Sequence, residues 1–266
     1  MSRRPLGRLA QRVADQLPLP LVRPISIALR RKSFPLVHSG RCGSTVLLDL
    51  LGQHPEVVAD GEILGSYDRR TARWPPLETL ERRMLAQIGR YYCFSTKTSR
   101  WDDLSPEKAD LPLADYVRGL VRIGFSAFVV IRRKNLLAQS VSGIVARERG
   151  SWHTTDVQKQ AVRVRVPVEG GRASALVEGM IHLESMYAEL DRLLARHECL
   201  HLTYEDDVLL DPLIGYAKIC DHVGIAQRPV AVRLRQTNPF ALRDVVANYD
   251  EVQSALAGTA FAWMLE

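Results

Sequence analysis

The fold is decided by residues 34–47, Phe34-Pro-Leu-Val-His-Ser-Gly-Arg-Cys-Gly-Ser-Thr-Val-Leu47, an apolar strand followed by a short turn and an apolar helix. Gly40 and Gly43 leave the backbone of the turn bare, and the N–H groups at the start of the helix point towards it. Ser44 and Thr45 add hydroxyl donors, and Arg41 adds a full positive charge. The stretch therefore predicts a turn that holds a phosphate-like anion.

The nucleotide-binding loop G-x-x-x-x-G-K-[ST] would require glycine at His38 and lysine at Ser44, so this pattern is not matched. Residues 41–45 instead resemble the 5′-phosphosulfate-binding loop of sulfotransferases, [KR]-[SA]-G-[ST]-[ST] after the first strand. The resemblance implies that the sulfuryl donor is contacted by Arg41, Cys42, Gly43, Ser44 and Thr45, with Cys42 replacing a more usual serine. An ordinary strand-to-helix turn is the alternative that this loop alone leaves open.

Composition and charge limit the class of protein. The chain has 266 residues, of which 46% are hydrophobic and 25% charged, as expected of one α/β domain. Its net charge of +6 indicates an anionic partner. The four cysteines have no C-x-x-C spacing, which argues against a zinc site or a disulfide scaffold. No signal peptide or apolar run of membrane-spanning length is evident, so a cytoplasmic location is expected.

Residues 1–33 form a basic N-terminal leader, and the sulfotransferase-like domain is expected over 34–266. The leader mixes arginines with scattered apolar residues and is interrupted by Pro18 and Pro20. Two interpretations stay open. One is a solvated segment that packs loosely on the domain, which its shortness and its prolines favour. The other is an amphipathic segment that contacts anionic lipid.

The remaining pattern alternates strands with helices, which predicts a central parallel sheet with helices on both faces. The sequence therefore favours an α/β, P-loop-like three-layer fold. Strands are expected at 34–38, 57–59, 91–98, 125–131 and 199–203. Helices are expected at 44–51, 77–88, 105–123 (one helix or two short ones), 135–149, 172–196 and 211–223. A last helix is expected near the C-terminus, and an excursion over the site at 151–170.

Two residues at strand ends are candidates for chemistry. Glu62 follows the second strand, at the sheet edge where α/β folds bind ligands, and a carboxylate there can act as a general base. A solvated loop carboxylate is the plainer alternative. Golgi-type, tyrosylprotein and several bacterial sulfotransferases carry their catalytic glutamate in a similar Gly-Glu context. The same resemblance implies that Lys97, at the end of the third strand, contacts the sulfuryl group.

Further along the chain, Arg132 ends a buried strand eight residues before Ser140. This spacing resembles the Arg-x7-Ser motif with which sulfotransferases bind the 3′-phosphate of the donor. A basic helix start with an incidental serine is the alternative. The segment from Tyr204 to Pro212 resembles the family's Y-E-D-L-x-x-D-P run, which implies that Tyr204 lies near the adenine. Arg235, in a basic loop before the last helix, is a further candidate contact.

By this resemblance the chain is expected to transfer a sulfuryl group from 3′-phosphoadenosine 5′-phosphosulfate (PAPS) to an acceptor hydroxyl, without a metal. The expected acceptor is a glycan, a glycolipid or another small molecule, and nucleic acid is not expected. The leading alternative is a small-molecule kinase that uses ATP; a nucleic-acid or membrane-binding protein is third. His38, His54 and His153 are conceivable bases in place of Glu62.

Overall fold

A computed structural model describes residues 16, 18–20, 23, 31–65, 71–87, 89–98, 111–168 and 176–265. Its centre is a five-stranded sheet in the order β2-β3-β1-β4-β5, and every pair of neighbouring strands is parallel. The strands are β1 (Ser33–His38), β2 (Val57–Asp60), β3 (Tyr91–Lys97), β4 (Ala127–Arg132) and β5 (Glu198–Thr203). The predicted α/β fold is confirmed, with the apolar run before the glycine turn as the central strand.

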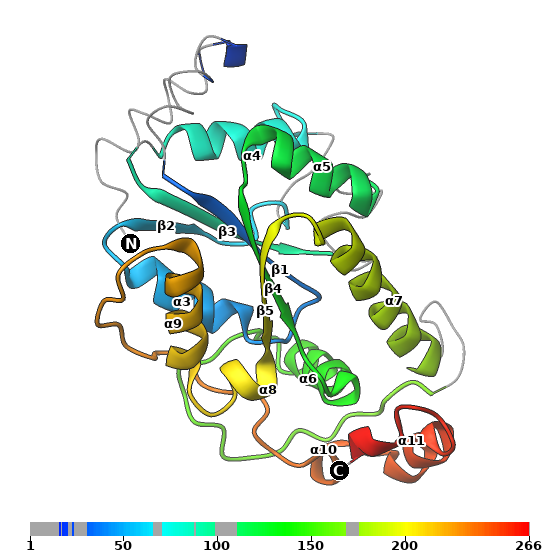
Figure 1. Ribbon diagram of the computed structural model, residues 1–266. Coiled ribbons are helices and arrows are strands. Elements are labelled where there is room, and N and C mark those ends of the chain that lie inside the picture. Colours follow the sequence, from blue (N-terminus) through cyan, green and yellow to red (C-terminus); the bar gives the residue numbers. More distant parts are fainter. Residues whose placement is uncertain are drawn as a thin grey trace.

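Helices cover both faces of the sheet (Figure 1). One face packs against α3 (Ser44–Gln53) and α9 (Pro212–Val223), and the other packs against α4 (Pro76–Leu85), α5 (Leu113–Ile123) and α7 (Leu176–Leu194). Because side chains alternate across a strand, β4 divides between the two cores. Val129 and Ile131 face α3 and α9, whereas Phe128 and Val130 face α5 and α7. Both faces are therefore buried, as a parallel sheet requires.

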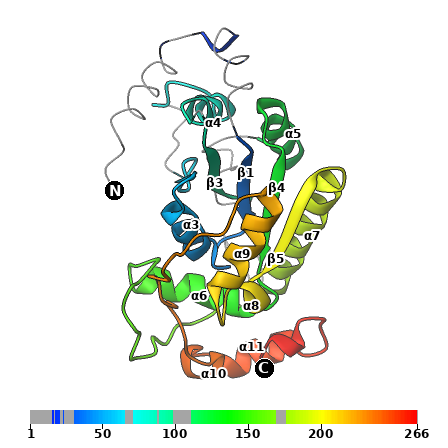
Figure 2. The same cartoon turned by 60° about the vertical axis from the view of Figure 1, so that its left-hand side comes forward.

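A third apolar cluster lies at the carboxyl edge of the sheet. It joins α6 (Leu136–Glu148) to α10 (Leu242–Val245), α11 (Tyr249–Leu256) and the 3₁₀ helix η1 (Ala262–Leu265). In both views these elements gather at the lower end of the molecule, beside α8 (Tyr204–Asp207) (Figures 1 and 2). The C-terminal part of the chain thus closes the end of the sheet at which the β1–α3 turn lies.

Some predicted boundaries differ. The helix expected at 77–88 ends at Leu85, and the one expected at 172–196 is described from Leu176 to Leu194. The helix start expected at Ser105-Pro106 lies outside the described residues. Residues 151–168 cross the carboxyl edge mostly without regular structure, with isolated bridges from Thr154 to Arg235 and from Val164 to Val246.

The end of the leader is tied to the domain by ion pairs. Arg23 makes a two-pronged contact with the buried Glu81 of α4, at 2.6 and 2.8 Å. Lys32, just before β1, pairs with Glu198 of β5 at 2.9 Å. Within the described ranges, no helix combines the length and apolar character needed to cross a membrane.

Candidate functional site

The turn between β1 and α3 is built from left-handed backbone. Gly40 has φ 87°, Arg41 has φ 53° and Gly43 has φ 82°, and α3 begins at Ser44. Residue 43 must be glycine for a second reason: a Cβ there would come within 2.6 Å of Val208 Cγ1. The bare backbone thus packs directly against α8, and the helix N-terminus opens beside it, which favours an anion.

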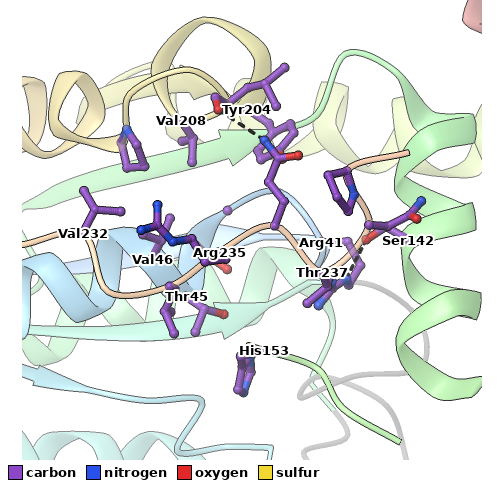
Figure 3. A pocket seen from close by; sticks show the side chains of 18 of the residues that line it. Arg41, Thr45, Val46, Ser142, His153, Tyr204, Val208, Val232, Arg235 and Thr237 are labelled. Carbon is purple, nitrogen blue, oxygen red and sulfur yellow. Dashed lines mark hydrogen bonds between the residues drawn. The ribbon is translucent and has the colours of Figure 1, made fainter. Parts of the chain in front are cut away.

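A cavity of about 580 Å³ opens from this turn (Figure 3). That volume lies in the usual range for a small-molecule site. Its wall combines the start of α3, the ends of β4 and β5, α6, and two covering segments, residues 152–158 and 232–239. The cavity lining includes Arg41, Ser44, Thr45, Arg133, Ser142, Trp152, His153, Tyr204, Val208, Arg235 and Thr237.

Arg41 ties the turn to both covering segments. Its Nε donates to Ser142 Oγ at 3.1 Å, its Nη1 donates to the Trp152 carbonyl at 2.7 Å, and its Nη2 donates to Thr237 Oγ1. Figure 3 shows Arg41, Ser142 and Thr237 converging at one end of the cavity. Burial, and then the nearby Arg133, lower the pKa of Arg41, but an arginine remains charged at neutral pH. The end of the cavity is therefore positively charged.

Arg133 supplies a second charge. Its guanidinium lies 4.6 Å from the centre of the Tyr204 ring, and its Nη1 lies 3.4 Å from the Arg41 carbonyl oxygen. Only 16% of its side chain is exposed, and its Nε has no hydrogen-bond partner among the described residues. Burial lowers the pKa of Arg133 and raises that of Tyr204. A cation and an aromatic ring thus stand together in the wall, which suits a phosphate beside a flat ring.

Arg132 and Ser140, the predicted 3′-phosphate pair, are not brought to the cavity. Arg132 donates to Asp191 of α7 and lies over the Tyr187 ring at 4.7 Å. It follows Phe128 and Val130 on the α7 face of β4, whereas the next residue, Arg133, emerges on the α3 face. On α6, Ser142 lines the cavity and Ser140 does not. A phosphate in this cavity would meet Arg133 and Ser142.

The other residues predicted to contact PAPS fall into two groups, those that line the cavity and one that does not. Arg41, Gly43, Ser44, Thr45, Tyr204 and Arg235 line the cavity. Cys42 points into the core, where it is fully buried, and burial raises the pKa of its thiol to about 11. The backbone N–H of Arg235 donates to the Thr154 carbonyl at 2.8 Å, which joins the two covering segments.

Glu62 and Lys97 are brought together beside the turn. Lys97 Nζ lies 2.7 Å from Glu62 Oε2, and the two side chains are 25% and 34% exposed. The Lys97 stem lies over the turn, with Cε 3.7 Å from where a Gly40 Cβ would be. The Ser95 N–H donates to the Gly61 carbonyl at 3.3 Å, which fixes the Gly-Glu turn to β3. A partly exposed carboxylate and a cation thus lie side by side next to the β1–α3 turn.

The three histidines that were considered as alternative bases have different surroundings. His38 is fully buried, with Nδ1 accepting from the Gly40 N–H at 2.9 Å and Nε2 lying 2.7 Å from Ser95 Oγ. His54 is also buried, and both of its nitrogens are bonded. Neither can reach a substrate. His153 is exposed and lines the cavity, so it remains the alternative to Glu62.

Arg133, Ser142 and Thr237 line the cavity but were not among the site residues predicted from the sequence. For Arg133 the signal was present, because the alternation of β4 places residue 132 on the α7 side. Ser142 lies two residues, or about 200°, around α6 from Ser140, and the eight-residue spacing counted from Arg133 falls on Val141, so the spacing does not select Ser142 from either arginine. Thr237 lies 196 residues from Arg41, and no local pattern connects them.

Three comparisons relate the chain to known proteins. No protein-family model matches it. The chain is 25% identical over 245 residues to nodulation protein H of Rhizobium meliloti (strain 1021), and the match covers 88% of this chain and 94% of that protein. The crystal structure of a sulfotransferase from Alicyclobacillus acidocaldarius superposes with a TM-score of 0.48 and 12% identity, over 90% of this chain and 95% of that one. A superposition at that level assigns no residue and no reaction.

Proposed function

We propose that the protein is a sulfotransferase that moves a sulfuryl group from PAPS to an acceptor hydroxyl. The observation that carries the proposal is the cavity at the β1–α3 turn, where two partly buried cations, Arg41 and Arg133, stand with the Tyr204 ring around a space of nucleotide size. The resemblance of residues 41–45 to the phosphosulfate-binding loop supports the same reading. The similarity to nodulation protein H along most of the chain is compatible with it.

The residues present fit a donor with phosphates at two ends. A side chain at residue 43 would fill the space against Val208, so only bare backbone can face an anion there. The α3 N-terminus, with Ser44 and Thr45, would hold the 5′-phosphosulfate. Arg133 and Ser142 would hold the 3′-phosphate, in place of Arg132 and Ser140, and Tyr204 would lie near the adenine. Arg235 would contact the donor from the covering segment.

The donor, when bound, supplies a sulfuryl group already activated by its bond to phosphate. Glu62 would accept the proton of the acceptor hydroxyl as the oxygen–sulfur bond forms. Lys97 and Arg41 would balance the negative charge on the sulfuryl oxygens and on the departing phosphate oxygen. Arg41 would also hold the covering segments closed, through Trp152 and Thr237, and so limit the access of water.

A kinase that uses ATP is the second candidate, and the turn argues against it. The nucleotide-binding loop would place its first glycine at residue 38 and its lysine at residue 44, where this chain has the fully buried His38 and Ser44. The sulfotransferase loop pattern departs from this turn only at Cys42.

The acceptor class we propose is a glycan, a glycolipid or another small molecule with a hydroxyl group. We also propose a cytoplasmic location, with the basic segment 1–33 available for peripheral contact with anionic lipid. Incubation with radiolabelled PAPS and fractionated host extract would show which fraction gains label. Label on a glycan or lipid fraction would agree with the acceptor class, and label confined to protein would contradict it.

The donor is tested by thermal unfolding with 3′,5′-diphosphoadenosine in the presence of a chelator, against ATP with magnesium, RNA and anionic vesicles. A ligand at one hundred times its Kd should stabilise the protein by about 2.7 kcal/mol. We expect the bisphosphate nucleotide alone to do so without a metal. Stabilisation by ATP with magnesium but not by the bisphosphate would favour the kinase.

A further inference from the structure

We propose that His38 is a positioning residue that fixes the anion-binding turn and links it to Lys97. The ring lies at the end of β1, two residues before Gly40, and is completely buried. The ring does not line the cavity, and no described hydrogen bond joins it to Glu62 or Lys97. Its effect on an anion would therefore pass through the backbone of the turn.

The hydrogen bonds of His38 determine which nitrogen carries the proton. The Gly40 N–H donates to Nδ1 at 2.9 Å, so Nδ1 must be an unprotonated acceptor. Nε2 then carries the hydrogen and donates it to Ser95 Oγ at 2.7 Å. Burial, with a smaller contribution from Lys97, lowers the pKa of His38 to about 3, so the ring stays neutral near neutral pH. This neutral tautomer matches both partners.

The turn needs such support because it holds a non-glycine residue in a costly conformation. Among the described residues Arg41 is the one non-glycine residue with positive φ, at 53°. A left-handed residue other than glycine costs about 1–3 kcal/mol and persists only when its surroundings determine it. Both peptide groups of Gly40 are held by buried side chains: His38 accepts from its N–H, and Gln139 donates to its carbonyl at 2.7 Å. These two contacts fix the direction in which Arg41 leaves the turn.

The second nitrogen of His38 extends this support to β3. Ser95 stands two residues before Lys97, so both side chains leave β3 on the same face. In the β1–β3 register, His38 itself lies opposite Lys97. A single ring thus joins the turn that bears Arg41 to the strand that bears Lys97. The relative placement of the two cations depends on it.

Two substitutions separate the two contacts. In His38→Asn the side-chain oxygen falls where Nδ1 lies, and asparagine commonly accepts from the N–H two residues on. In His38→Gln the amide reaches the Nε2 position and Ser95, but leaves the Gly40 N–H without an acceptor. Each variant loses one buried hydrogen bond, so similar losses in Tm are expected. The two variants differ in whether the Gly40 N–H keeps its hydrogen bond to the side chain of residue 38.

The test measures the Kd of 3′,5′-diphosphoadenosine and of inorganic pyrophosphate for wild type and both variants by calorimetry. We expect His38→Asn to stay within about threefold of wild type and His38→Gln to weaken both ligands about tenfold, the worth of one hydrogen bond. Equal Kd values for the two variants, whether both are unchanged or both are weakened, would reduce His38 to a packing residue.

The measurements with 3′,5′-diphosphoadenosine rest on the proposed sulfotransferase function. Those with inorganic pyrophosphate do not, so they distinguish a failure of that function from a failure of this inference. If wild type binds pyrophosphate but not the nucleotide, the sulfotransferase proposal fails while the pyrophosphate comparison still tests His38. If wild type binds neither, the turn holds no anion and the inference is overturned.

Nitrogen-15 NMR of wild type provides a reading that does not depend on whether the variants fold. A protonated Nε2 and an unprotonated Nδ1 between pH 6 and 8 support the inference. A protonated Nδ1 would contradict it, because such a ring cannot accept from Gly40.

Discussion

The two faces of the sheet carry similar side chains at their carboxyl edge but use them differently. On the face covered by α3 and α9, Arg41 and Arg133 stand at a cavity with Tyr204. On the face covered by α5 and α7, Arg132 is paired with Asp191 and stacked on Tyr187. An arginine and a tyrosine meet on each side. Only on the first side do they border a space that a ligand could fill.

The difference comes from the carboxylates within reach. Asp191 accepts a direct hydrogen bond from Arg132, whereas Arg133 approaches Glu205 no closer than 3.9 Å. Glu205 is occupied by the start of α6, where its oxygens accept from the N–H groups of Lys134 and Asn135 at 2.9 and 3.1 Å. A carboxylate held by a helix N-terminus leaves the neighbouring cation more available to an external anion. Of these adjacent arginines, Arg132 is held in a structural contact, and Arg133 is the one that we propose for binding.

The largest effect is expected for Glu62, and Asp191 on the α7 face provides the comparison. Glu62→Gln keeps the shape but removes the basic oxygen, so turnover with a verified acceptor should fall at least about a hundredfold while donor affinity is kept. Asp191→Asn, on the α7 face, should leave turnover within about threefold, since surface ion pairs contribute little. Steady-state kinetics of the two variants provide the measurement. Turnover near the wild-type rate in Glu62→Gln would transfer the role of base to His153.

The next comparison is between alanine substitutions of Arg133 and of Arg132. Arg133→Ala should weaken 3′,5′-diphosphoadenosine about ten- to a hundredfold, because a charge-assisted hydrogen bond contributes about 1.5–3 kcal/mol. The affinity for 5′-AMP, which lacks the 3′-phosphate, should change little. Arg132→Ala should leave both affinities nearly unchanged. Calorimetric titration decides between the residues, and the opposite ranking would restore Arg132 to the 3′-phosphate.

A third prediction concerns acid stability on the α3 face. The pKa of folded His38 is about 3, below its ordinary value of 6.5, so between these values the unfolded chain binds a proton that the folded chain does not. Stability from this group is therefore complete above pH 6.5 and is lost as the pH falls towards 3, by about 1.4 kcal/mol per pH unit. Urea unfolding at several pH values measures the slope. His38→Asn should have a shallower slope, and an unchanged slope would refute the assignment.

The smallest expected effect is at Cys42. Its thiol is buried and lies outside the cavity lining, although its neighbours in the turn line it. Cys42→Ser should therefore keep the Kd of 3′,5′-diphosphoadenosine within about threefold, less than the loss of one hydrogen bond could cause. Some loss of Tm is expected, because a hydroxyl replaces an apolar group in the core. A larger change in Kd would mean that residue 42 contacts the donor.

Much of the fold could be predicted from periodicity alone. The apolar runs before Gly40 and Arg132 are typical of strands buried on both faces, and they form β1 and β4. Glu62 and Lys97 could be placed near each other, because both follow strands of one parallel sheet and such strands end at the same edge. The structure brings them to 2.7 Å.

The site was harder to predict where sequence spacing competed with side-chain direction. The eight-residue spacing selected Arg132, but the strand carries that residue to the α7 face, and a motif count does not record direction. The contact between Arg41 and Thr237 joins segments that meet only after the C-terminal part of the chain has packed on α6. Tertiary contacts of that kind leave no local signal.

Hydrogen–deuterium exchange with and without 3′,5′-diphosphoadenosine tests the central claim directly, because it locates the ligand on one face of the sheet. We predict slower exchange at residues 41–46, in α8 and at 232–239, and no change in the half of α7 that carries Tyr187 and Asp191. Slower exchange confined to α7, or no change at saturating nucleotide, would contradict the assignment of the donor site to the α3 face.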